Sequence, residues 1–249
     1  MAWTQTESLS FAARHEEGDE ECAERILDQL EDQRLRLEDR FELVPGEITI
    51  VIHPSSAWLA AAHPFLPLIR LAAAPSARRY LAGWISREEL HTLNDRALER
   101  RAAGPDSLRA LRGTADRLYA QLVLAANVPP IPPPWGPRSL LRYLQWAWLV
   151  EGGAQYFSGS VPSFRPAVTR RLAEGPEPAF PPAARDAIIL GGTVFDLLDR
   201  AVGRHACELL ASRLRKDGAI PALEVAFGVD AEVIEAQWRK HLRALRTVG

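Results

Sequence analysis

The stretch WLVEGGAQYF, residues 148–157, places a single carboxylate, Glu151, inside an otherwise apolar run. It belongs to a segment, residues 138 to 158, whose pattern predicts one helix. A carboxylate is costly to bury unless another group pairs with it. Two interpretations therefore stay open. Either Glu151 belongs to an inward-facing polar site, or it is solvated and Gly152-Gly153 serves only to let helices pack closely.

Upstream of this helix the chain carries strand patterns. Residues 48 to 53 (ITIVIH) are apolar and mostly β-branched, which predicts a buried strand. Residues 8 to 15 predict a short strand, and residues 79 to 86 and 89 to 93 predict two more that would form a hairpin. Helices are predicted after Gly18-Asp19, with Asp19 as N-cap, at 96 to 103, and at 107 to 127, where apolar residues recur at helical spacing.

A proline-rich segment divides the chain. Six prolines within residues 128 to 137 exclude a helix or an inner strand and predict a stiff extended connector. Strands before it and helices after it predict an α+β protein. We expect an N-terminal lobe, residues 1–127, with a mixed sheet and a central helix, and a helical lobe, residues 128–249. In the second lobe the predicted helices are 138–158, 185–202, 205–216 and 230–245, and an irregular loop is predicted from 159 to 182.

The stretch around Glu151 resembles the W-L-x-E-G-x-A-x-Y signature of the gluzincin metallopeptidases, the clan that includes thermolysin. The opening strand, the helix after Gly18-Asp19 and the ITIVIH strand are similar to the N-terminal lobe of small bacterial members. Further similarity lies in Thr193-Val-Phe-Asp-Leu-Leu, Ala226-Phe-Gly228 and Glu235-x-x-Trp238. The resemblance implies a zincin-like fold and gives Glu151 the position of the third zinc ligand.

In that family, the other two ligands and the general base form H-E-x-x-H on the preceding helix. Two histidines at i and i+4 share one helical face, and the glutamate activates the metal-bound water. Here the helix at 107–127 contains no histidine, and the alignment puts Arg117 and Gln121 at the histidine positions and Leu118 at the glutamate position. Arginine repels a metal, glutamine is a poor zinc ligand, and leucine cannot transfer a proton.

The resemblance therefore implies a lost zinc site, with no catalytic residue, metal or cofactor. We expect Arg117 to pair with the carboxylate of Glu151 in its place, with Gln121 adding a hydrogen bond. Tyr119, Trp148, Tyr156 and His91 are candidates for the cleft. No two of the six histidines stand at i, i+4 on a predicted helix, so a rebuilt metal site is not expected.

Composition excludes several classes of protein. The 249 residues carry a net charge of −2, with 47% hydrophobic residues, which gives no general attraction to nucleic acid or anionic membranes. No apolar run is long enough to span a bilayer. Cys22 and Cys207 are expected to be buried free thiols, with a single disulfide as the alternative. The N-terminus has no signal-peptide pattern, so the expected location is cytoplasmic, or secreted if a leader has been removed.

Three functions stay open at this point. The first is a non-catalytic, metallopeptidase-like protein that binds a peptide or protein partner in the vestigial cleft or serves as a scaffold. The second is an active hydrolase with a rebuilt or metal-free site. The third is an unrelated interaction module, in which the helices at 107–127 and 138–158 would not meet at a common cleft. The oligomeric state is left open.

Overall fold

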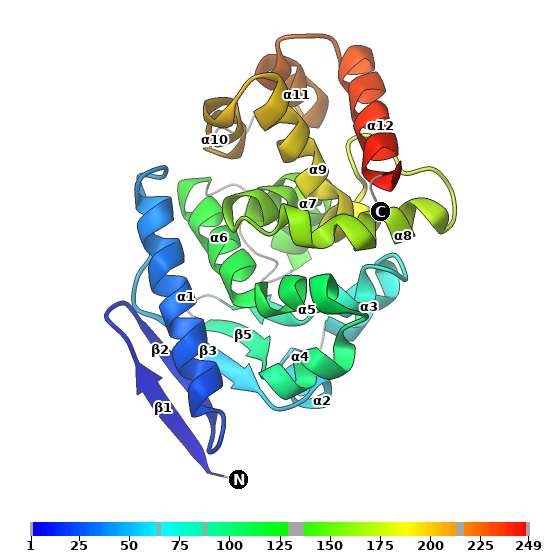
Figure 1. The fold of residues 1–249 in the computed structure, drawn as a ribbon. Helices are drawn as coiled ribbons and strands as arrows, with labels where there is room; N and C mark the ends of the chain where they lie inside the picture. The colour runs from blue at the N-terminus through cyan, green and yellow to red at the C-terminus, as the bar shows by residue number, and fades with distance from the viewer. Residues whose placement is uncertain (1, 64–65, 87–88, 129–136, 213–216, 248–249) are drawn as a thin grey trace.

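The computed structural model describes residues 2–63, 66–86, 89–128, 137–212 and 217–247. Within these ranges, one five-stranded mixed sheet and twelve α-helices form an α+β protein, as predicted (Figure 1). The strands are β1 (Trp3–Glu7), β2 (Phe11–Glu16), β3 (Ile48–His53), β4 (Gly83–Ile85) and β5 (Glu89–Leu93). The helices up to the proline-rich segment are α1 (Glu20–Glu38), α2 (Ser56–Ala62), α3 (Leu66–Ala72), α4 (Asp95–Arg101), α5 (Pro105–Arg112) and α6 (Thr114–Asn127).

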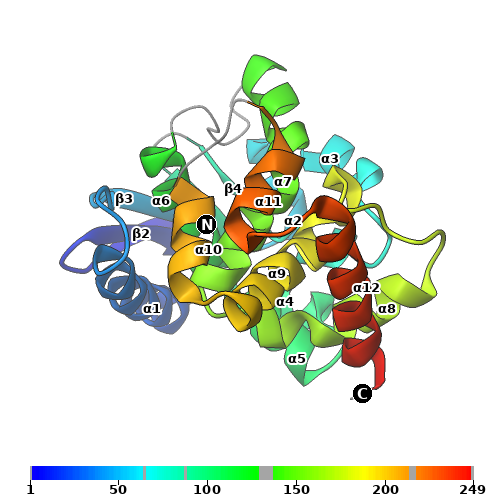
Figure 2. The ribbon, with the colours of Figure 1, turned by 90° about the horizontal axis from the view of Figure 1, so that it is seen from above.

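The helices after that segment are α7 (Pro137–Phe157), α8 (Arg165–Ala173), α9 (Ala184–Ala201), α10 (Arg204–Ser212), α11 (Ala219–Phe227) and α12 (Ala231–Thr247). Two short 3-10 helices are η1 (Arg78–Tyr80) and η2 (Val161–Phe164). In Figure 1 the sheet lies at one end of the molecule, next to the N-terminus, and α10, α11 and α12 lie at the other. Seen from above in Figure 2, α10 and α11 lie on one side of α9 and α12 and α8 on the other.

The sheet has the strand order β1-β2-β3-β5-β4. Its three inner strands run parallel, whereas β1 pairs antiparallel with β2 and β4 pairs antiparallel with β5. The strand at 48–53 and the strand at 89–93 with its antiparallel partner are thus confirmed. The predicted strand at 79–86 is corrected to Gly83–Ile85, because Arg78–Tyr80 form the 3-10 helix η1. The predicted strand at 8–15 is β2, and its partner β1 was missed because WTQTE is polar and mostly exposed, so it carries no buried face.

Helix α1 packs on this sheet through an apolar face that includes Ala23, Ile26 and Leu30. Asp19 precedes it as expected, but its side chain makes no capping hydrogen bond. The Asp19 carboxylate instead accepts a hydrogen bond of 2.9 Å from the Asn94 amide, which comes from the loop after β5. The Asp19 side chain therefore does not cap α1, and it connects the start of α1 to the loop after β5 instead.

The predicted helix at 107–127 is divided at Gly113 into α5 and α6. Glycine is a poor helix former, and at the end of α5 the Thr114 hydroxyl donates to the carbonyl of Leu111 at 2.6 Å. The predicted loop at 159–182 is also corrected, because it contains η2 and α8. Residues 55 to 77, which carried no clear pattern, hold α2 and α3.

One hydrophobic core runs from the sheet to the C-terminal helices, with α7 packed between α6 and α9. Cys22 and Cys207 are buried free thiols, as expected. Most of the proline-rich connector lies outside the described residues, and the lobe boundary at 127/128 stays a prediction. In the described part of the chain, no helix combines the length and the hydropathy needed to cross a membrane.

Candidate functional site

The Gly152-Gly153 pair of the opening stretch sets the distance between helices. A Cβ atom added at Gly152 would lie 2.5 Å from the carbonyl of Gly191 on α9, and one added at Gly191 would lie 2.7 Å from the carbonyl of Trp148. Real Cβ atoms do not approach backbone atoms so closely, so each helix needs glycine at the crossing. A Cβ atom added at Gly153 would meet the end of the Leu124 side chain of α6 at 2.8 Å, a contact that this flexible side chain could relieve by moving. The glycines therefore bring α6, α7 and α9 together around Glu151.

Glu151 is buried, and it faces a small cavity between α6, α7 and the edge strand β4. Tyr143, two turns earlier on α7, donates its hydroxyl hydrogen bond to the Glu151 carboxylate. Burial raises the pKa of Glu151, while the Tyr143 hydrogen bond, the charge of Arg117 and the Gln121 side chain act in the opposite direction. The interpretation of Glu151 as a solvated residue is wrong, because α9 and α6 cover this face of α7.

Arg117 lies in the same cavity wall and its charge acts on Glu151, but its side chain does not form the predicted ion pair and binds backbone carbonyls instead. Its guanidinium donates to the carbonyl of Ala110 at 2.8 Å and to that of Tyr80 at 3.4 Å. It also lies 4.9 Å from the centre of the Phe164 ring. The end of α5 at Gly113 contributes to the correction, because the carbonyl of Ala110 in its last turn accepts from the guanidinium, and the carbonyl of Tyr80 in η1 is the second acceptor. Burial lowers the pKa of Arg117 to about 10.

Leu118 and Gln121 complete the α6 side of this cavity, as the alignment implied. The opposite wall comes from Ile69 of α3 and Trp84 of β4. The cavity has a volume of about 50 Å³, which leaves room for a few water molecules and for no larger ligand as it stands. We name it the Glu151 cavity. Tyr143 is the residue that sequence reasoning missed, although its spacing of eight residues places it on the same helical face as Glu151.

The four other cleft candidates do not meet at the Glu151 cavity. Tyr119 donates its hydroxyl to the carbonyl of Pro45 at 2.7 Å, on the far side of α6. Trp148 is fully buried and packs beside Trp146.

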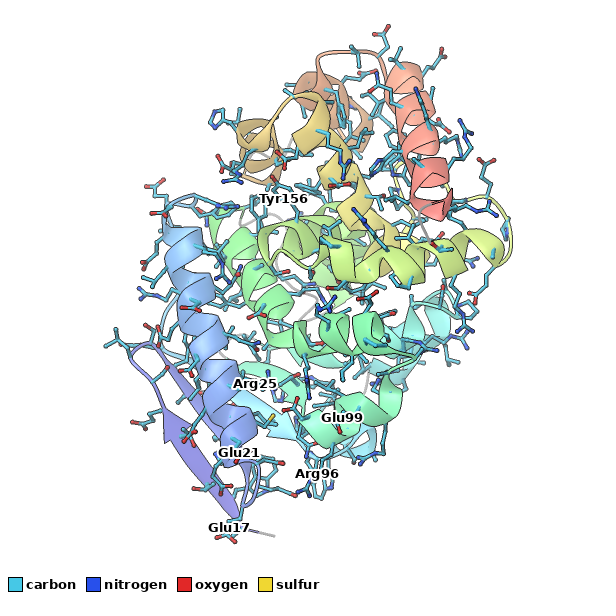
Figure 3. The ribbon with its side chains drawn as sticks, in the orientation of Figure 1. Glu17, Glu21, Arg25, Arg96, Glu99 and Tyr156 are labelled. Carbon is cyan, nitrogen blue, oxygen red and sulfur yellow. The ribbon has the colours of Figure 1, made fainter. Side chains whose placement is uncertain are left out.

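Tyr156 packs on Phe157 and Phe195. It lies near α9 and α10, at the end of α7 away from the sheet (Figure 3). These side chains therefore belong to the core and not to a common cleft.

His91, the fourth candidate, belongs to a cluster that was not predicted. Parallel pairing of β3 with β5 brings His53 and His91 together, and His63 follows the end of α2. The Nε2 atom of His53 and the Nδ1 atom of His91 share a hydrogen bond of 3.0 Å, and the His63 ring meets the His91 ring edge to face with centres 4.3 Å apart. We name these residues the histidine cluster. Sequence spacing gave no sign of it because the three residues come from separate elements.

The geometry of the Glu151 cavity and of the histidine cluster does not suit a metal ion. Across the described ranges, no three His, Cys, Asp or Glu side chains are arranged to hold a metal ion, and this holds for the histidine cluster and for Glu151. Around Glu151 the nearest candidates are a guanidinium, an amide and a phenol, which are not the ligands that zinc prefers.

Comparison of the chain with protein-family models, with curated proteins and with solved structures finds no match in any of the three.

Proposed function

We propose that this protein is a non-catalytic relative of the gluzincin metallopeptidases and that it binds a peptide or protein segment beside the Glu151 cavity. One observation carries the proposal: Arg117, Leu118 and Gln121 of α6 and Glu151 of α7 line the same cavity. These are the four positions at which the resemblance implies two zinc ligands, a general base and a third ligand. An unrelated module would not need these helices to meet there.

The chemistry of the four side chains supports a site without catalysis. The Arg117 guanidinium is engaged by backbone carbonyls, and Leu118 has no group that moves a proton. Glu151 is held by Tyr143, and burial raises its pKa, which disfavours the ionised form that binds metals. A single such carboxylate does not hold zinc in the manner of a site with three protein ligands.

The edge strand β4 supports a role in binding. It pairs with β5 on one side, and it ends the strand order of the described sheet. Its residues Gly83, Trp84 and Ile85 line the Glu151 cavity, so an extended segment that added to this edge would run past the cavity. Main-chain hydrogen bonds to an edge strand are a common mode of peptide recognition. The partner is therefore proposed to be a segment in extended conformation.

The hydrolase alternative has less support. Of the groups that could act as acid or base, Tyr119 and Tyr156 lie in the core away from Glu151, and His91 lies in the histidine cluster. A peptide library tests this alternative directly. Turnover that is abolished by Glu151→Ala would favour the hydrolase.

The experiment for the proposal is reconstruction of the implied zinc site. The triple variant Arg117→His, Leu118→Glu and Gln121→His restores the family pattern, and we expect the folded variant to bind about one zinc per chain after incubation with zinc and desalting. The matched control adds Glu151→Gln, which removes the third ligand and should abolish stable binding. Metal content is measured by elemental analysis, and folding by circular dichroism.

Two results would contradict the proposal. Stoichiometric zinc in the unmodified protein would mean that the chain holds an intact zinc site and that residues other than these four are its ligands. A triple variant that folds but binds no more zinc than its Glu151→Gln control would mean that the four positions do not correspond to a former zinc site.

A further inference from the structure

The histidine cluster has a contact pattern that depends on its protonation. His53 and His91 are buried, and their single mutual hydrogen bond, of 3.0 Å, needs one nitrogen to donate and the other to accept. Two protonated rings would face each other with donors only. The observed packing therefore requires that at least one of these two rings is neutral.

Each ring also has a buried nitrogen without a hydrogen-bond partner. These atoms are Nδ1 of His53, Nε2 of His63 and Nε2 of His91. Protonation gives a ring a charge and a second N–H donor. At His53 and His63 the unpaired nitrogen would bury that donor without an acceptor, whereas Nε2 of His91 lies 3.3 Å from the Glu89 carboxylate. Protonation of His53 or His63 is thus opposed by the site.

The charged neighbours compensate for such a proton only in part. Among the described residues, Arg14 of β2 and Glu89 of β5 are the charged groups that act on the cluster. Glu89 lies 3.3 Å from Nε2 of His91 but outside hydrogen-bond geometry, and its other oxygen pairs with Arg14 at 2.6 Å. The facing side chains from β1 and β4, Trp3 and Trp84, carry no charge.

Burial accordingly lowers the pKa of both His63 and His91 to about 4, and it also lowers the pKa of His53. Within the cluster the rings repel each other's charge, which adds to this effect for His63 and His91. The cluster therefore stays neutral at pH 7 and becomes charged only in acid.

The cluster joins two elements to the centre of the sheet. His63 ends α2, which packs on β3 and β5, and its ring also contacts Trp84 of β4 at a distance of 5.5 Å between ring centres. Trp84 is the register partner of His91 and lines the Glu151 cavity. A charge on His63 or His91 would thus act on α2 and on the strand that borders the cavity.

We propose that the histidine cluster is an acid-sensitive latch, which holds α2 and β4 on the sheet while its three rings are neutral and releases them when the rings are protonated. Its effect on access to the Glu151 cavity rests on the proposed binding function, whereas the release itself does not.

Hydrogen–deuterium exchange of the whole protein tests the latch without any ligand. Protection factors, corrected for intrinsic exchange, are measured for α2, β4 and α9 at pH 7 and pH 4.5. Helix α9 is the internal reference because it lies away from the cluster. We expect protection of α2 and β4 to fall at least tenfold relative to α9 in acid.

Two variants separate the latch from a general effect of acid. His63→Phe keeps a ring at the contact with His91 and Trp84 but removes one of the titrating groups, so the relative loss at pH 4.5 should become smaller, and the loss that remains belongs to His53 and His91. His205→Phe makes the same change at an exposed histidine on α10 and should behave like the unmodified protein.

The proposal is overturned if α2 keeps its protection relative to α9 at pH 4.5, or if His63→Phe loses as much protection as the unmodified protein. A failed zinc reconstruction would leave this result unchanged, so the latch and the proposed function fail independently.

Discussion

At the scale of single residues, the most informative feature is the way buried charges find partners. Glu151 was expected to bind Arg117, but Tyr143 of its own helix supplies the hydrogen bond and Arg117 binds backbone carbonyls. Both solutions satisfy buried polar groups, and which one forms depends on carbonyls that the break at Gly113 leaves free.

Removal of the Tyr143 hydroxyl tests this arrangement. Tyr143→Phe leaves a buried carboxylate without its donor, and we expect a loss of about 1 to 3 kcal/mol in the free energy of unfolding. In a Glu151→Gln background the same substitution should cost less, because the remaining acceptor is uncharged. Urea unfolding of the four proteins in this cycle measures the coupling. An equal cost in both backgrounds would contradict the assigned contact.

A buried ion pair joins α8 to α9. Arg171 and Asp186 are both 2% exposed and share two hydrogen bonds of 2.5 and 2.8 Å. Arg171→Leu leaves the buried Asp186 carboxylate with only the half-exposed Arg185 beside it, at 3.6 Å, and we expect a loss of about 3 to 5 kcal/mol in the free energy of unfolding. Arg170→Leu is the matched control, since its pair with Glu174 is exposed and should be worth about 1 kcal/mol or less. Similar losses for both variants, measured by urea unfolding, would contradict this reasoning.

At the scale of elements, the crossing of α7 and α9 sets the position of Glu151. Two glycines, Gly152 and Gly191, let the helices approach until their backbones touch. The sequence shows the first glycine pair beside Glu151, but it does not show that its partner is Gly191.

Substitution of Gly152 tests the crossing. Gly152→Ala would place a Cβ atom 2.5 Å from the Gly191 backbone, and we expect at least 1 to 3 kcal/mol of destabilisation, about the cost of overpacking a core. Gly113→Ala is the control, because the nearest atom would lie 3.7 Å away and the backbone φ of −76° suits alanine. It should change stability by about 1 kcal/mol or less in either direction. Thermal and urea unfolding measure the stability of both variants. A Gly152→Ala variant as stable as the unmodified protein would contradict the close approach of α7 and α9.

At the scale of the whole molecule, stability in acid is a balance of opposite effects. His63 and His91 have pKa values of about 4 in the folded protein, below the value of about 6.5 for an unfolded chain, so their contribution is complete above pH 6.5 and is lost as the pH falls toward 4. Asp116 acts in the opposite sense. Burial raises its pKa to about 6, so a penalty present above pH 6 is relieved as the pH falls.

This balance predicts how two variants respond to pH. The unmodified protein should be less stable at pH 4.5 than at pH 7, because the histidine contributions outweigh that of Asp116. Asp116→Asn removes the compensating group and should lose more stability over this interval, whereas His63→Phe should lose less. Urea unfolding at both pH values provides the test, and an Asp116→Asn variant with a smaller loss than the unmodified protein would contradict the signs assigned here.

Much of the fold could be predicted from local patterns. The ITIVIH strand, the hairpin of β4 and β5 and the helix that carries Glu151 were found because hydrophobic periodicity is a property of consecutive residues. Strand β1 and helix α8 were missed, since WTQTE has no buried face and the segment after Gly159 has an irregular pattern that tertiary contacts stabilise. The resemblance placed Glu151 and Gln121 on two helices that meet at one cavity, and the expected hydrogen bond from Gln121 acts on Glu151. The Tyr143 hydrogen bond and the carbonyl partners of Arg117 were not predicted.

The sequence by itself therefore determined the α+β class and the elements with strong periodicity, and the resemblance named four of the side chains that line the Glu151 cavity. Only the tertiary structure decided that Arg117 binds carbonyls, that Tyr143 holds Glu151, and that three histidines from separate elements share one cluster. The physical reason is the range of the interactions. Periodicity and helical spacing act over a few residues, whereas hydrogen bonds, charge burial and ring contacts act between groups that meet only when the chain is packed.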